Sequence, residues 1–503
     1  MQTSLLLEMT ADAAPDRAAV SDGDRRLDLG RLAASARGAA ATLQAAEGER
    51  VVFLGLNGEA VSIAIFASAL VGKPFVPLNY RLADDALRRL VERSAPAVAV
   101  VDDNMLPRVS AIAGITYITR SVFEAAYRDP TNQRQELPVV DADIAVLLFT
   151  SGTTGDPKAA VLRHHHLTSY VVSTVDFLGA EEDEASLVSV PPYHIAGISA
   201  VLTGIYSGRQ IVYLPSFTPE AWVDAAVANK VTHAMVVPTM LGRILDVLDA
   251  RGIGLPHLKA LSYGGGRMPL PVIERAMARL PHVDFVNAYG LTETSSTVAV
   301  LGPDDHRQAM ASSDPAVRRR MGSVGRPLPT LELEIRDPEG RVVPTGESGE
   351  IHVRGEQVAG EYLERKVIAE DGWFATNDAG WLDKEGFLFV EGRLDDVIVR
   401  GGENISPGEI EDVLRAHPAI ADLAVFGVPD DQWGERIACV VVARGTPPAT
   451  ADLADWVKAR LRSTKTPDVW EFRAELPYND MGKLLRRVLR DDILARDRET
   501  ASA

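Results

Sequence analysis

The sequence predicts an α/β protein with a large N-terminal domain of layered α/β subdomains and a small α+β C-terminal domain. Three observations favour this fold class. A chain of 503 residues is too long for one ordinary domain. Apolar runs alternate with helical patterns through the first three-quarters of the chain, which is typical of layered architecture with largely parallel sheets. The pattern changes after Gly392, where shorter alternating units begin.

Four segments illustrate the alternation in the N-terminal part. Residues 51–56 and 98–101 are apolar runs of strand length, and a helical pattern rich in small residues, 60–70, lies between them. Residues 144–149 form another apolar run, which predicts a buried strand. Residues 304–320 are polar and charged, and we expect a surface excursion there.

The C-terminal part contains two helical patterns and three strand-like runs, which together favour a small α+β domain. We expect helices at 410–416 and 453–461, and strands near 423–426, 437–442 and 470–472. The boundary is expected at Arg393-Leu394-Asp395-Asp396, which gives domains of residues 1–394 and 395–503. No Pro-, Gly- or Ser-rich linker marks this boundary.

The composition is that of a soluble globular protein, with 46% hydrophobic and 24% charged residues. The net charge of −18 disfavours a nucleic-acid-binding protein, because no positive field exists to attract a phosphate backbone. Small anionic ligands remain possible, since they need only a local cluster of donors. The single cysteine, Cys439, lies in an apolar run, which predicts a buried strand residue and excludes a disulfide framework within the chain.

The N-terminal segment carries Glu8 and Asp12 and no basic cluster, which argues against a signal peptide. The longest apolar stretch, residues 61–71, is too short to span a bilayer. We therefore expect a cytoplasmic protein without a transmembrane segment.

Residues 150–158, with the sequence Thr-Ser-Gly-Thr-Thr-Gly-Asp-Pro-Lys, are the most informative stretch because their composition suits phosphate. Glycines permit close backbone approach to a ligand, and exposed N–H groups in such a turn form an anion-binding concavity. The spacing is not that of a Walker A loop, and taken alone a polar surface turn is equally compatible. The candidate phosphate-binding residues are Thr150, Ser151, Gly152, Thr153, Thr154, Gly155 and Lys158.

Three further segments carry candidate functional side chains, and each has a simpler structural explanation when taken alone. Residues 191–197 contain one imidazole and one phenol beside small residues, although a lone histidine is more often structural. Residues 262–269 are a glycine-rich turn that would admit a flat ligand or simply reverse the chain. Residues 287–294 offer an aromatic face for a purine and a carboxylate for a hard divalent cation. The same residues are equally compatible with a helix N-terminus that has a capping threonine.

Two more segments lie closer to the C-terminus. Residues 372–378 end in Asp378, a carboxylate suited to a ribose diol or simply exposed in a turn. Residues 481–487 carry Lys483, which could neutralise charge in a transition state or merely solvate a helix surface.

Taken together and in this order, the segments resemble those of the adenylate-forming superfamily. This superfamily includes acyl- and aryl-CoA synthetases, nonribosomal peptide adenylation domains and firefly luciferase, and the chain is most similar to bacterial acyl-CoA synthetases. The resemblance covers nearly the whole length. The segments that carry it are residues 150–158, 289–293, 346–350, 376–378, 392–396, 401–405 and 482–483.

The resemblance implies an ATP-dependent carboxylate–CoA ligase with two half-reactions. A hydrophobic acyl or aryl acid attacks the α-phosphorus of Mg-ATP, which gives an acyl-adenylate and pyrophosphate. Coenzyme A then displaces AMP. The implied cofactors are ATP, Mg²⁺ and coenzyme A, and the implied partners are a small carboxylic acid and coenzyme A, with no nucleic acid.

The resemblance also implies roles for individual residues. Loop 150–158 would hold the β- and γ-phosphates, Thr292 and Glu293 would contact the α-phosphate and Mg²⁺, and Tyr289 would stack on adenine. Lys483 would bridge the substrate carboxylate and the α-phosphate, where a cation offsets the repulsion between two anions. The other residues of the implied ATP or AMP site are Gly265, Gly266, Arg267, Asn287, Gly290, Asp378 and Arg393.

On the acyl side, His194 would border the reacting carboxyl group. The implied acyl pocket is mostly apolar, which favours a hydrophobic acid. Its expected residues are Tyr193, Ile195, Gly197, Val237 and Pro238.

The resemblance further implies a mobile C-terminal domain with its hinge at Asp395. Lys483 would serve the first half-reaction from one face of this domain. Gly401 and Gly402, which lack side chains, would admit the pantetheine arm in the second half-reaction from another face. A rotation about Asp395 would exchange the two faces.

Three positions depart from the usual pattern of the family. Ala159 follows the loop lysine, and Asn377 precedes Asp378, where glycine is usual in both cases. Asparagine tolerates left-handed φ better than most residues, so we expect the turn at Asn377 to persist. Arg267 stands where many relatives carry proline, and its side chain could reach a ligand or point to solvent.

Three alternatives remain open. Arg243 stands where some malonyl-CoA synthetases carry a carboxylate-binding arginine, which raises a dicarboxylate substrate as an alternative. A second alternative is an enzyme that adenylates an acid and loads a separate carrier protein. A third is a non-catalytic nucleotide-binding protein, against which Lys483 and Glu293 argue.

Overall fold

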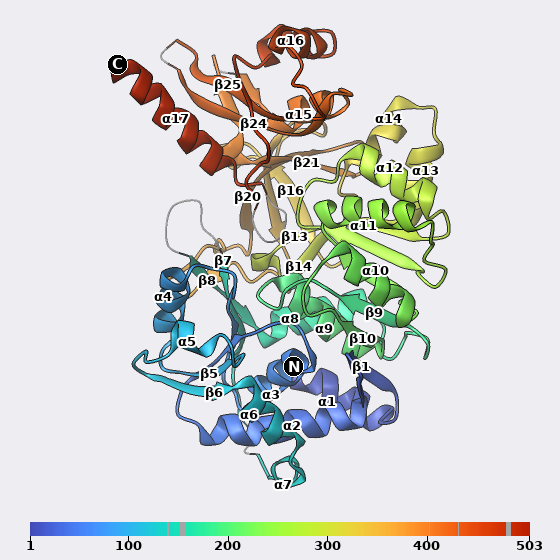
Figure 1. Cartoon of the computed structure of the whole chain (residues 1–503), viewed down its shortest axis with the longest axis vertical. Coiled ribbons are helices and arrows are strands. Elements are labelled where there is room, and N and C mark those ends of the chain that lie inside the picture. Colours follow the sequence, from blue (N-terminus) through green and yellow to red (C-terminus); the bar gives the residue numbers. More distant parts are fainter. Residues whose placement is uncertain (138–139, 151–156, 402, 431, 479–483, 503) are drawn as a thin grey trace.

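The structure is a computed structural model. Within the residues that it describes, the chain forms two large sheets, a small antiparallel sheet and a C-terminal sheet. Figure 1 shows the C-terminal domain at the top, with the two large sheets and their helices below it. The predicted fold class, with a large N-terminal and a smaller C-terminal domain, is confirmed. The described residues are 1–137, 140–150, 157–401, 403–430, 432–478 and 484–502.

The first large sheet has the strand order β19-β18-β8-β7-β4-β3-β5-β6. The strands from β7 to β6 in this order are parallel, and β8, β18 and β19 are antiparallel additions. Strands such as β5 are buried along their whole length, as expected where helices cover both faces of a parallel sheet. The strands are β3 (Arg50–Leu54), β4 (Phe75–Pro77), β5 (Ala97–Val101), β6 (Ile115–Thr119), β7 (Ile144–Thr150), β8 (Lys158–Arg163), β18 (Glu361–Tyr362) and β19 (Arg365–Lys366).

The second large sheet has the strand order β15-β14-β13-β12-β11-β9-β10-β1-β2. The strands from β13 to β1 in this order are parallel, and antiparallel strands close the sheet at both edges. The strands are β1 (Ala18–Asp22), β2 (Arg25–Asp28), β9 (Ala185–Val188), β10 (Gln210–Tyr213), β11 (His233–Val236), β12 (Ala260–Gly264), β13 (Asp284–Leu291), β14 (Ser296–Leu301) and β15 (Arg326–Pro327).

One apolar core joins the two sheets. It includes Val20 and Ile211 from the second sheet, Phe53 from the first, and Phe66 from helix α3 (Glu59–Leu70). Almost every residue of α3 is buried, as expected for a helix that is apolar on all sides. Other helices that contribute to this core are α1 (Ser4–Ala13), α2 (Leu29–Ala45), α6 (Arg120–Arg128), α8 (His164–Thr174) and α9 (Ile195–Ser207).

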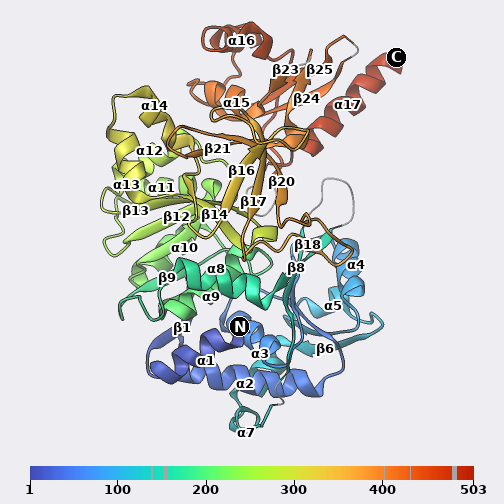
Figure 2. The ribbon, with the colours of Figure 1, turned by 180° about the vertical axis from the view of Figure 1, so that it is seen from behind.

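Most of the remaining helices of the N-terminal part cover the outer faces of the sheets, whereas α7 packs against α2 and α14 against α13 (Figures 1 and 2). Helix α4 is clearly amphipathic, because its buried residues recur at i, i+3, i+4 and i+7 while the rest are mostly charged. These helices are α4 (Asp84–Ser94), α5 (Leu106–Val109), α7 (Pro130–Gln133), α10 (Pro219–Ala228), α11 (Pro238–Arg251), α12 (Leu270–Arg279), α13 (Pro303–Ala311) and α14 (Pro315–Arg318).

A four-stranded antiparallel sheet lies between the second large sheet and the C-terminal domain (Figure 2). Its strands are β16 (Glu332–Arg336), β17 (Gly349–Arg354), β20 (Phe374–Leu382) and β21 (Leu388–Arg393). The C-terminal domain has its own sheet and its own apolar core. Its elements are β22 (Ile398–Arg400), β23 (Glu403–Ile405), α15 (Pro407–Arg415), β24 (Ile420–Asp430), β25 (Gly434–Ala443), α16 (Thr450–Lys458), β26 (Val469–Phe472) and α17 (Arg486–Ser502). Cys439 is fully buried in β25, as predicted.

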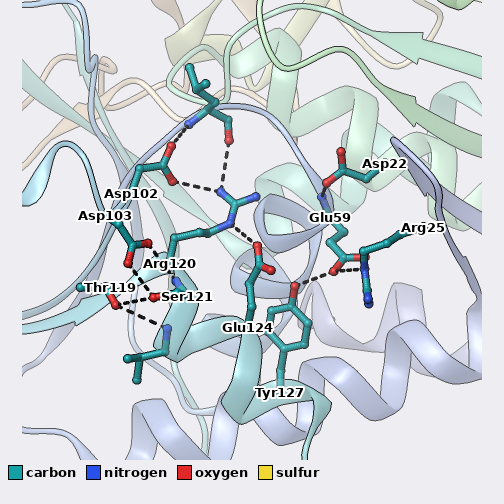
Figure 3. A network of polar contacts seen from close by, with 12 residues as sticks. Asp22, Arg25, Glu59, Asp102, Asp103, Thr119, Arg120, Ser121, Glu124 and Tyr127 are labelled. Atoms are coloured by element: carbon teal, nitrogen blue, oxygen red, sulfur yellow. Dashed lines mark hydrogen bonds and ion pairs between the residues drawn. The ribbon is translucent and has the colours of Figure 1, made fainter.

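A buried polar network ties β1, α3 and α6 together, and Figure 3 shows it from close by. At its centre is Glu59, in the first turn of α3, which is 1% exposed. Its carboxylate accepts hydrogen bonds from Tyr127 Oη (2.7 Å) and Arg128 Nη2 (2.9 Å), and it pairs with Arg25 Nε (2.7 Å). Burial alone would raise the pKa of Glu59, but these hydrogen bonds lower it overall.

The same network closes the carboxyl ends of β3 and β5. Arg120 donates to Leu56 O (3.4 Å) and to Asp102 Oδ1 (3.3 Å), and pairs with Glu124 at 2.9 Å. Because β4 and β5 flank β3, this point is the topological switch point of the sheet, where open α/β sheets usually bind ligands. Here the chain's own charged side chains occupy it (Figure 3).

The structure corrects two expectations. Residues 303–322 are not merely a surface excursion, because they form α13, α14 and the 3₁₀ turn η2 (Arg319–Gly322) and bury His306 and Arg320. The segment 287–294 is not a helix N-terminus, because it ends strand β13 and continues into the 3₁₀ turn η1 (Thr292–Thr294). Within the described residues, no helix is both long and apolar enough to cross a membrane.

Candidate functional site

Four neighbouring parallel strands, β9, β11, β12 and β13, end at the same edge of the second large sheet. The loops that follow such carboxyl ends are where open α/β sheets bind ligands. Those loops carry most of the candidate residues of the N-terminal part: His194 after β9, residues 237–238 after β11, residues 265–267 after β12, and residues 292–293 after β13.

Tyr289, Asp378 and Arg393 form one cluster. Tyr289 Oη donates to Asp378 Oδ2 at 2.7 Å, and Arg393 Nε lies 3.3 Å from Asp378 Oδ1. Asp378 and Arg393 are opposite each other on the antiparallel strands β20 and β21, which fixes the pair. Burial, and secondly Asp378, raise the pKa of Tyr289 well above its usual range, so its hydroxyl remains a donor.

Asp378 is 7% exposed inside β20, so the alternative of an aspartate exposed in a turn is wrong. Its neighbour Asn377 has a φ of 59°, the left-handed conformation that the sequence predicted this asparagine to tolerate. Asn377 N donates to Glu350 Oε1 at 3.0 Å. The expected turn at Asn377 is thus an irregularity inside β20, and the segment 346–350 contributes a carboxylate that holds it.

Glu293 lies in the turn η1 and is 8% exposed. Its side chain accepts a 2.5 Å hydrogen bond from Tyr362 Oη. Its backbone oxygen accepts hydrogen bonds from the N–H groups of Ala359 (2.8 Å) and Gly360 (3.2 Å). A segment distant in the sequence therefore holds both the side chain and the backbone of Glu293.

The base of the loop 150–158 is an antiparallel pair in which Thr150 is opposite Lys158. Thr150 Oγ1 lies 3.4 Å from Lys158 O, and Lys158 Nζ lies 5.8 Å from the ring centroid of Tyr362. Ala159, where the family has glycine, is fully buried in β8. The predicted phosphate-binding residues Ser151, Gly152, Thr153, Thr154 and Gly155 lie outside the described residues.

The glycine-rich turn adjoins two predicted acyl-pocket residues. A Cβ built on Gly265, whose φ is +76°, would lie 3.6 Å from Val237 Cγ1, and one on Gly266 would lie 4.0 Å from Pro238 Cγ. By contrast, Gly290 is explained by packing alone, because a Cβ there would lie 1.8 Å from the backbone oxygen of Ser296.

His194 is the N-cap residue of α9 and is half-buried, as is Ile195. The ring of Tyr193 is buried between His194 (centroids 4.6 Å apart) and Tyr80 (5.5 Å). Gly197 is buried, and a Cβ there would lie 2.6 Å from Pro191 O. Its small size therefore serves this backbone contact.

Other candidate residues contact protein groups. Arg267 forms an ion pair with Asp412 of α15, so its side chain points towards the C-terminal domain. Asn287 Nδ2 donates to Ser323 O at 3.0 Å. Asn377 Nδ2 donates to Asp395 Oδ2, at the predicted hinge, at 3.0 Å.

The C-terminal residues predicted to serve the reaction are only partly described. Gly401 has a φ of +57°, and its N–H donates to Trp433 O at 2.7 Å. A Cβ on Gly401 would lie 3.0 Å from the Trp433 ring. Gly402 and Lys483 lie outside the described residues.

Sequence reasoning missed Tyr362 and Asp412. Tyr362 is 69 residues from Glu293 in the sequence, and no local pattern pairs the two. For Asp412, the only indication in the sequence was Arg267 at a position where many relatives carry proline.

The residues suit a magnesium ion that arrives with its nucleotide. Among the residues that the structure describes, no group of three or more His, Cys, Asp or Glu side chains could hold a metal ion. Glu293 offers one buried carboxylate near the base of the phosphate loop. Mg²⁺ is commonly bound by one or two carboxylates together with substrate phosphates and water, so this arrangement fits.

Comparisons with known proteins find similarity over nearly the whole chain. The sequence profile described as AMP-binding enzyme matches residues 7–363, and the profile described as AMP-binding enzyme C-terminal domain matches residues 409–483. A feruloyl-CoA synthase from Amycolatopsis sp. is 34% identical over 491 residues, which covers 95% of this chain and 96% of the relative. A fatty acid–[acyl-carrier-protein] ligase from Streptomyces coeruleorubidus is 32% identical, with 89% and 87% covered.

Two solved structures resemble this chain over nearly its whole length. The o-succinylbenzoate CoA synthetase from Bacillus subtilis, in complex with its acyl-adenylate intermediate, has a TM-score of 0.82 at 28% identity and covers 97% of this chain and 98% of its own. ATP-bound MatB from Rhodopseudomonas palustris has a TM-score of 0.86 at 27% identity, with 98% and 99% covered.

Proposed function

The chain belongs to the AMP-binding enzyme family, and from this premise we propose that it is an ATP-dependent carboxylate–CoA ligase for a hydrophobic acyl or aryl acid. It is an enzyme, an AMP-forming acid–thiol ligase. Its cofactors are ATP, Mg²⁺ and coenzyme A. The observation that carries the proposal is the pair of clusters that begin at Tyr289 and Glu293, around the carboxyl end of β13: Tyr289–Asp378–Arg393 and Glu293–Tyr362–Lys158.

The first cluster suits a nucleoside. We propose that Tyr289 offers its ring to adenine and that Asp378 accepts hydrogen bonds from the ribose hydroxyls. An ionised carboxylate has about four lone-pair positions, so Asp378 can accept from the ribose while it still accepts from Tyr289 and pairs with Arg393. The Gly265–Gly266 turn, which adjoins Val237 and Pro238, would connect the nucleoside to the acyl pocket.

The second cluster suits the phosphates and the metal. Glu293 would hold Mg²⁺, and Lys158 with the loop 150–158 would hold the leaving pyrophosphate. Lys483 would come from the C-terminal domain to lie between the substrate carboxylate and the α-phosphate. A cation at that point offsets the repulsion between the two reacting anions.

The apolar character of the predicted pocket supports a hydrophobic acid. Val237 and the aromatic ring of Tyr193 are buried, and Ile195 is half-buried at the start of α9. The relatives above are named for aryl acids and a fatty acid. We therefore propose aryl acids and fatty acids as the first substrates to test.

Two alternatives follow from other observations. The dicarboxylate alternative depends on Arg243, whose exposed guanidinium lies 5.6 Å from the ring centroid of Phe217, and this exposure weighs against a desolvated anchor for a second carboxylate. The carrier-protein alternative is supported by the Streptomyces relative, which is an acyl-carrier-protein ligase.

The decisive experiment is pyrophosphate exchange into ATP with a panel of aryl, fatty and dicarboxylic acids, followed by mass spectrometry with coenzyme A or a carrier protein as acceptor. We expect pyrophosphate exchange that depends on a hydrophobic acid. With coenzyme A as acceptor, we expect the thioester of that acid. An absence of exchange across the whole panel would refute the adenylation step.

We expect the substitution Lys483→Ala to divide the two half-reactions. Adenylate formation should fall by at least about 100-fold, because the cation between two anions is lost. Formation of the thioester from supplied acyl-AMP should stay near the wild-type rate. Similar losses in both half-reactions would contradict the proposed role.

A further inference from the structure

We propose that Tyr362 is a positioning residue for adenylation, which fixes the Glu293 carboxylate with its hydroxyl and the Lys158 ammonium with its ring. The inference rests on the proposed function, in which these two residues face Mg²⁺ and the phosphates. Tyr362 would hold the side chains of Glu293 and Lys158 in one arrangement before ATP binds.

The hydroxyl contact is short and directional. Tyr362 Oη donates to Glu293 Oε1 at 2.5 Å, and Glu293 is 8% exposed. A hydrogen bond to an ionised carboxylate is roughly twice as strong as one between neutral groups. Because Tyr362 engages Oε1, the rotation of the carboxylate is fixed, and Oε2 is left as the oxygen for a cation.

Tyr362 is suited to remain a donor. A phenol ordinarily has a pKa of about 10, so the Tyr362 hydroxyl carries its proton throughout the physiological range.

The ring contact involves the loop lysine. Lys158 Nζ lies 5.8 Å from the centroid of the Tyr362 ring, within the range of a cation–π interaction. Lys158 begins β8, so it is the first residue of the strand that leaves the phosphate loop. One aromatic side chain therefore contacts both the predicted metal ligand and the predicted phosphate cation.

Hydrogen bonds hold the segment around Tyr362 at both ends. We call residues 357–363 the strap. At one end, Gln357 Nε2 donates to Thr294 O (3.0 Å) and Thr297 O (2.8 Å), which ties the strap to η1 and β14. At the other end, Tyr362 pairs with Ala160 of β8, and Leu363 N donates to Ala159 O at 3.0 Å.

The strap thus connects the phosphate-loop strand of the first large sheet to the Glu293 turn of the second. Outside it, Arg93 pairs with Glu364 at 2.8 Å and donates to Pro157 O, beside the same loop. Groups held in their reactive geometry before binding need not be ordered by the substrate, which lowers the free-energy cost of reaching the transition state.

The substitution Tyr362→Phe tests the hydroxyl, because it keeps the ring beside Lys158. We expect the Mg²⁺ concentration for half-maximal pyrophosphate exchange to rise about tenfold, as for loss of a hydrogen bond to a charged group. Saturating Mg²⁺ should restore most of kcat, and thioester formation from supplied acyl-AMP should be unchanged. Tyr362→Leu, which also removes the ring, should further raise the KM for ATP.

A binding measurement provides a second readout. Calorimetric titration with α,β-methylene-ATP, which the enzyme cannot cleave at the α-phosphorus, should show a weaker dependence of affinity on Mg²⁺ for Tyr362→Phe than for the wild type. The matched control is Tyr170→Phe, whose hydroxyl lies 3.3 Å from Thr297 Oγ1 and for which no contact with Glu293 is described. Its Mg²⁺ dependence should match that of the wild type.

Wild-type Mg²⁺ dependence in both assays for Tyr362→Phe would overturn the inference. Equal losses at every Mg²⁺ concentration and in both half-reactions would also overturn it, because they would indicate a merely structural role. A wild-type enzyme without pyrophosphate exchange would instead refute the proposed function, so the two failures are distinguishable.

Discussion

At the scale of single residues, the site is organised by phenols that donate to carboxylates. Tyr289 fixes Asp378 at 2.7 Å, and Tyr362 fixes Glu293 at 2.5 Å. In each pair the phenol has a raised pKa and remains protonated, so the phenol itself is a neutral partner, although Asp378 is paired in addition with the charged Arg393. Such a carboxylate can still attract a cation or accept from a diol.

The substitution Tyr289→Phe should therefore affect ATP binding more than turnover. It keeps the aromatic face but releases Asp378, and we expect the KM for ATP to rise about tenfold with kcat nearly unchanged. Steady-state exchange kinetics measure both values. Tyr213→Phe is the matched control, because its hydroxyl bonds Ser62 at 2.6 Å in the buried core. A KM unaffected by Tyr289→Phe would contradict the role of the hydroxyl.

At the scale of elements, the network around Glu59 holds α3 between the two large sheets. Glu59 is a buried charge with three hydrogen-bonding or ionic partners from β2 and α6. Removal of one partner from a buried ion pair is costly, because an uncompensated charge remains. The network therefore stabilises the orientation of α3 as long as Glu59 is ionised.

We expect Glu59→Gln to destabilise the protein by about 3 kcal/mol at pH 7. Because the folded-state pKa of Glu59 is lowered, its contribution is present above the unfolded-state pKa and is lost as the pH falls through the folded-state value. The difference between wild type and Glu59→Gln should therefore narrow below about pH 4.5. Urea unfolding of both proteins at pH 7 and pH 4 measures this difference in the free energy of unfolding.

The control for this prediction is Glu339→Gln, an exposed carboxylate paired with Arg341, which should change stability by less than about 1 kcal/mol. A constant difference between wild type and Glu59→Gln at both pH values would contradict the linkage to ionisation.

Local patterns predicted the elements whose period is regular, such as 98–101 and 144–149, because burial on both faces leaves an uninterrupted apolar run. They failed at 303–322, where the buried groups include His306 and Arg320 and apolar residues are sparse. The burial of Asp378 and its bond to Tyr289 depend on tertiary pairing, which no local pattern encodes. The roles of individual site residues came from the order of the motifs.

At the scale of the whole molecule, the two domains meet through residues that are unusual for the family. Arg267 pairs with Asp412 of α15 and packs against Gly408, and Asn377 bonds Asp395 at 3.0 Å. Proline at position 267 could not form this ion pair, and glycine at position 377 could not form this hydrogen bond. The described orientation of the C-terminal domain is thus stabilised by the side chains of Arg267 and Asn377.

Cross-linking of this contact tests whether the C-terminal domain moves. Cysteines at 267 and 412, joined by a short bis-maleimide, should hold the described orientation, and we expect one half-reaction to fall at least about tenfold while the other persists. Cys439 should not interfere, because it is fully buried and burial raises the pKa of its thiol. Each single cysteine variant is a control. Wild-type rates for both half-reactions in the linked protein would contradict domain movement.

The strength of the Arg267–Asp412 ion pair depends on ionic strength. The two side chains are 39% and 38% exposed, so dissolved ions can screen their attraction. The screening length falls from about 10 Å at 0.1 M salt to about 3 Å at 1 M. We therefore expect added salt to weaken this attachment of the C-terminal domain and to shift the balance between the two proposed half-reactions.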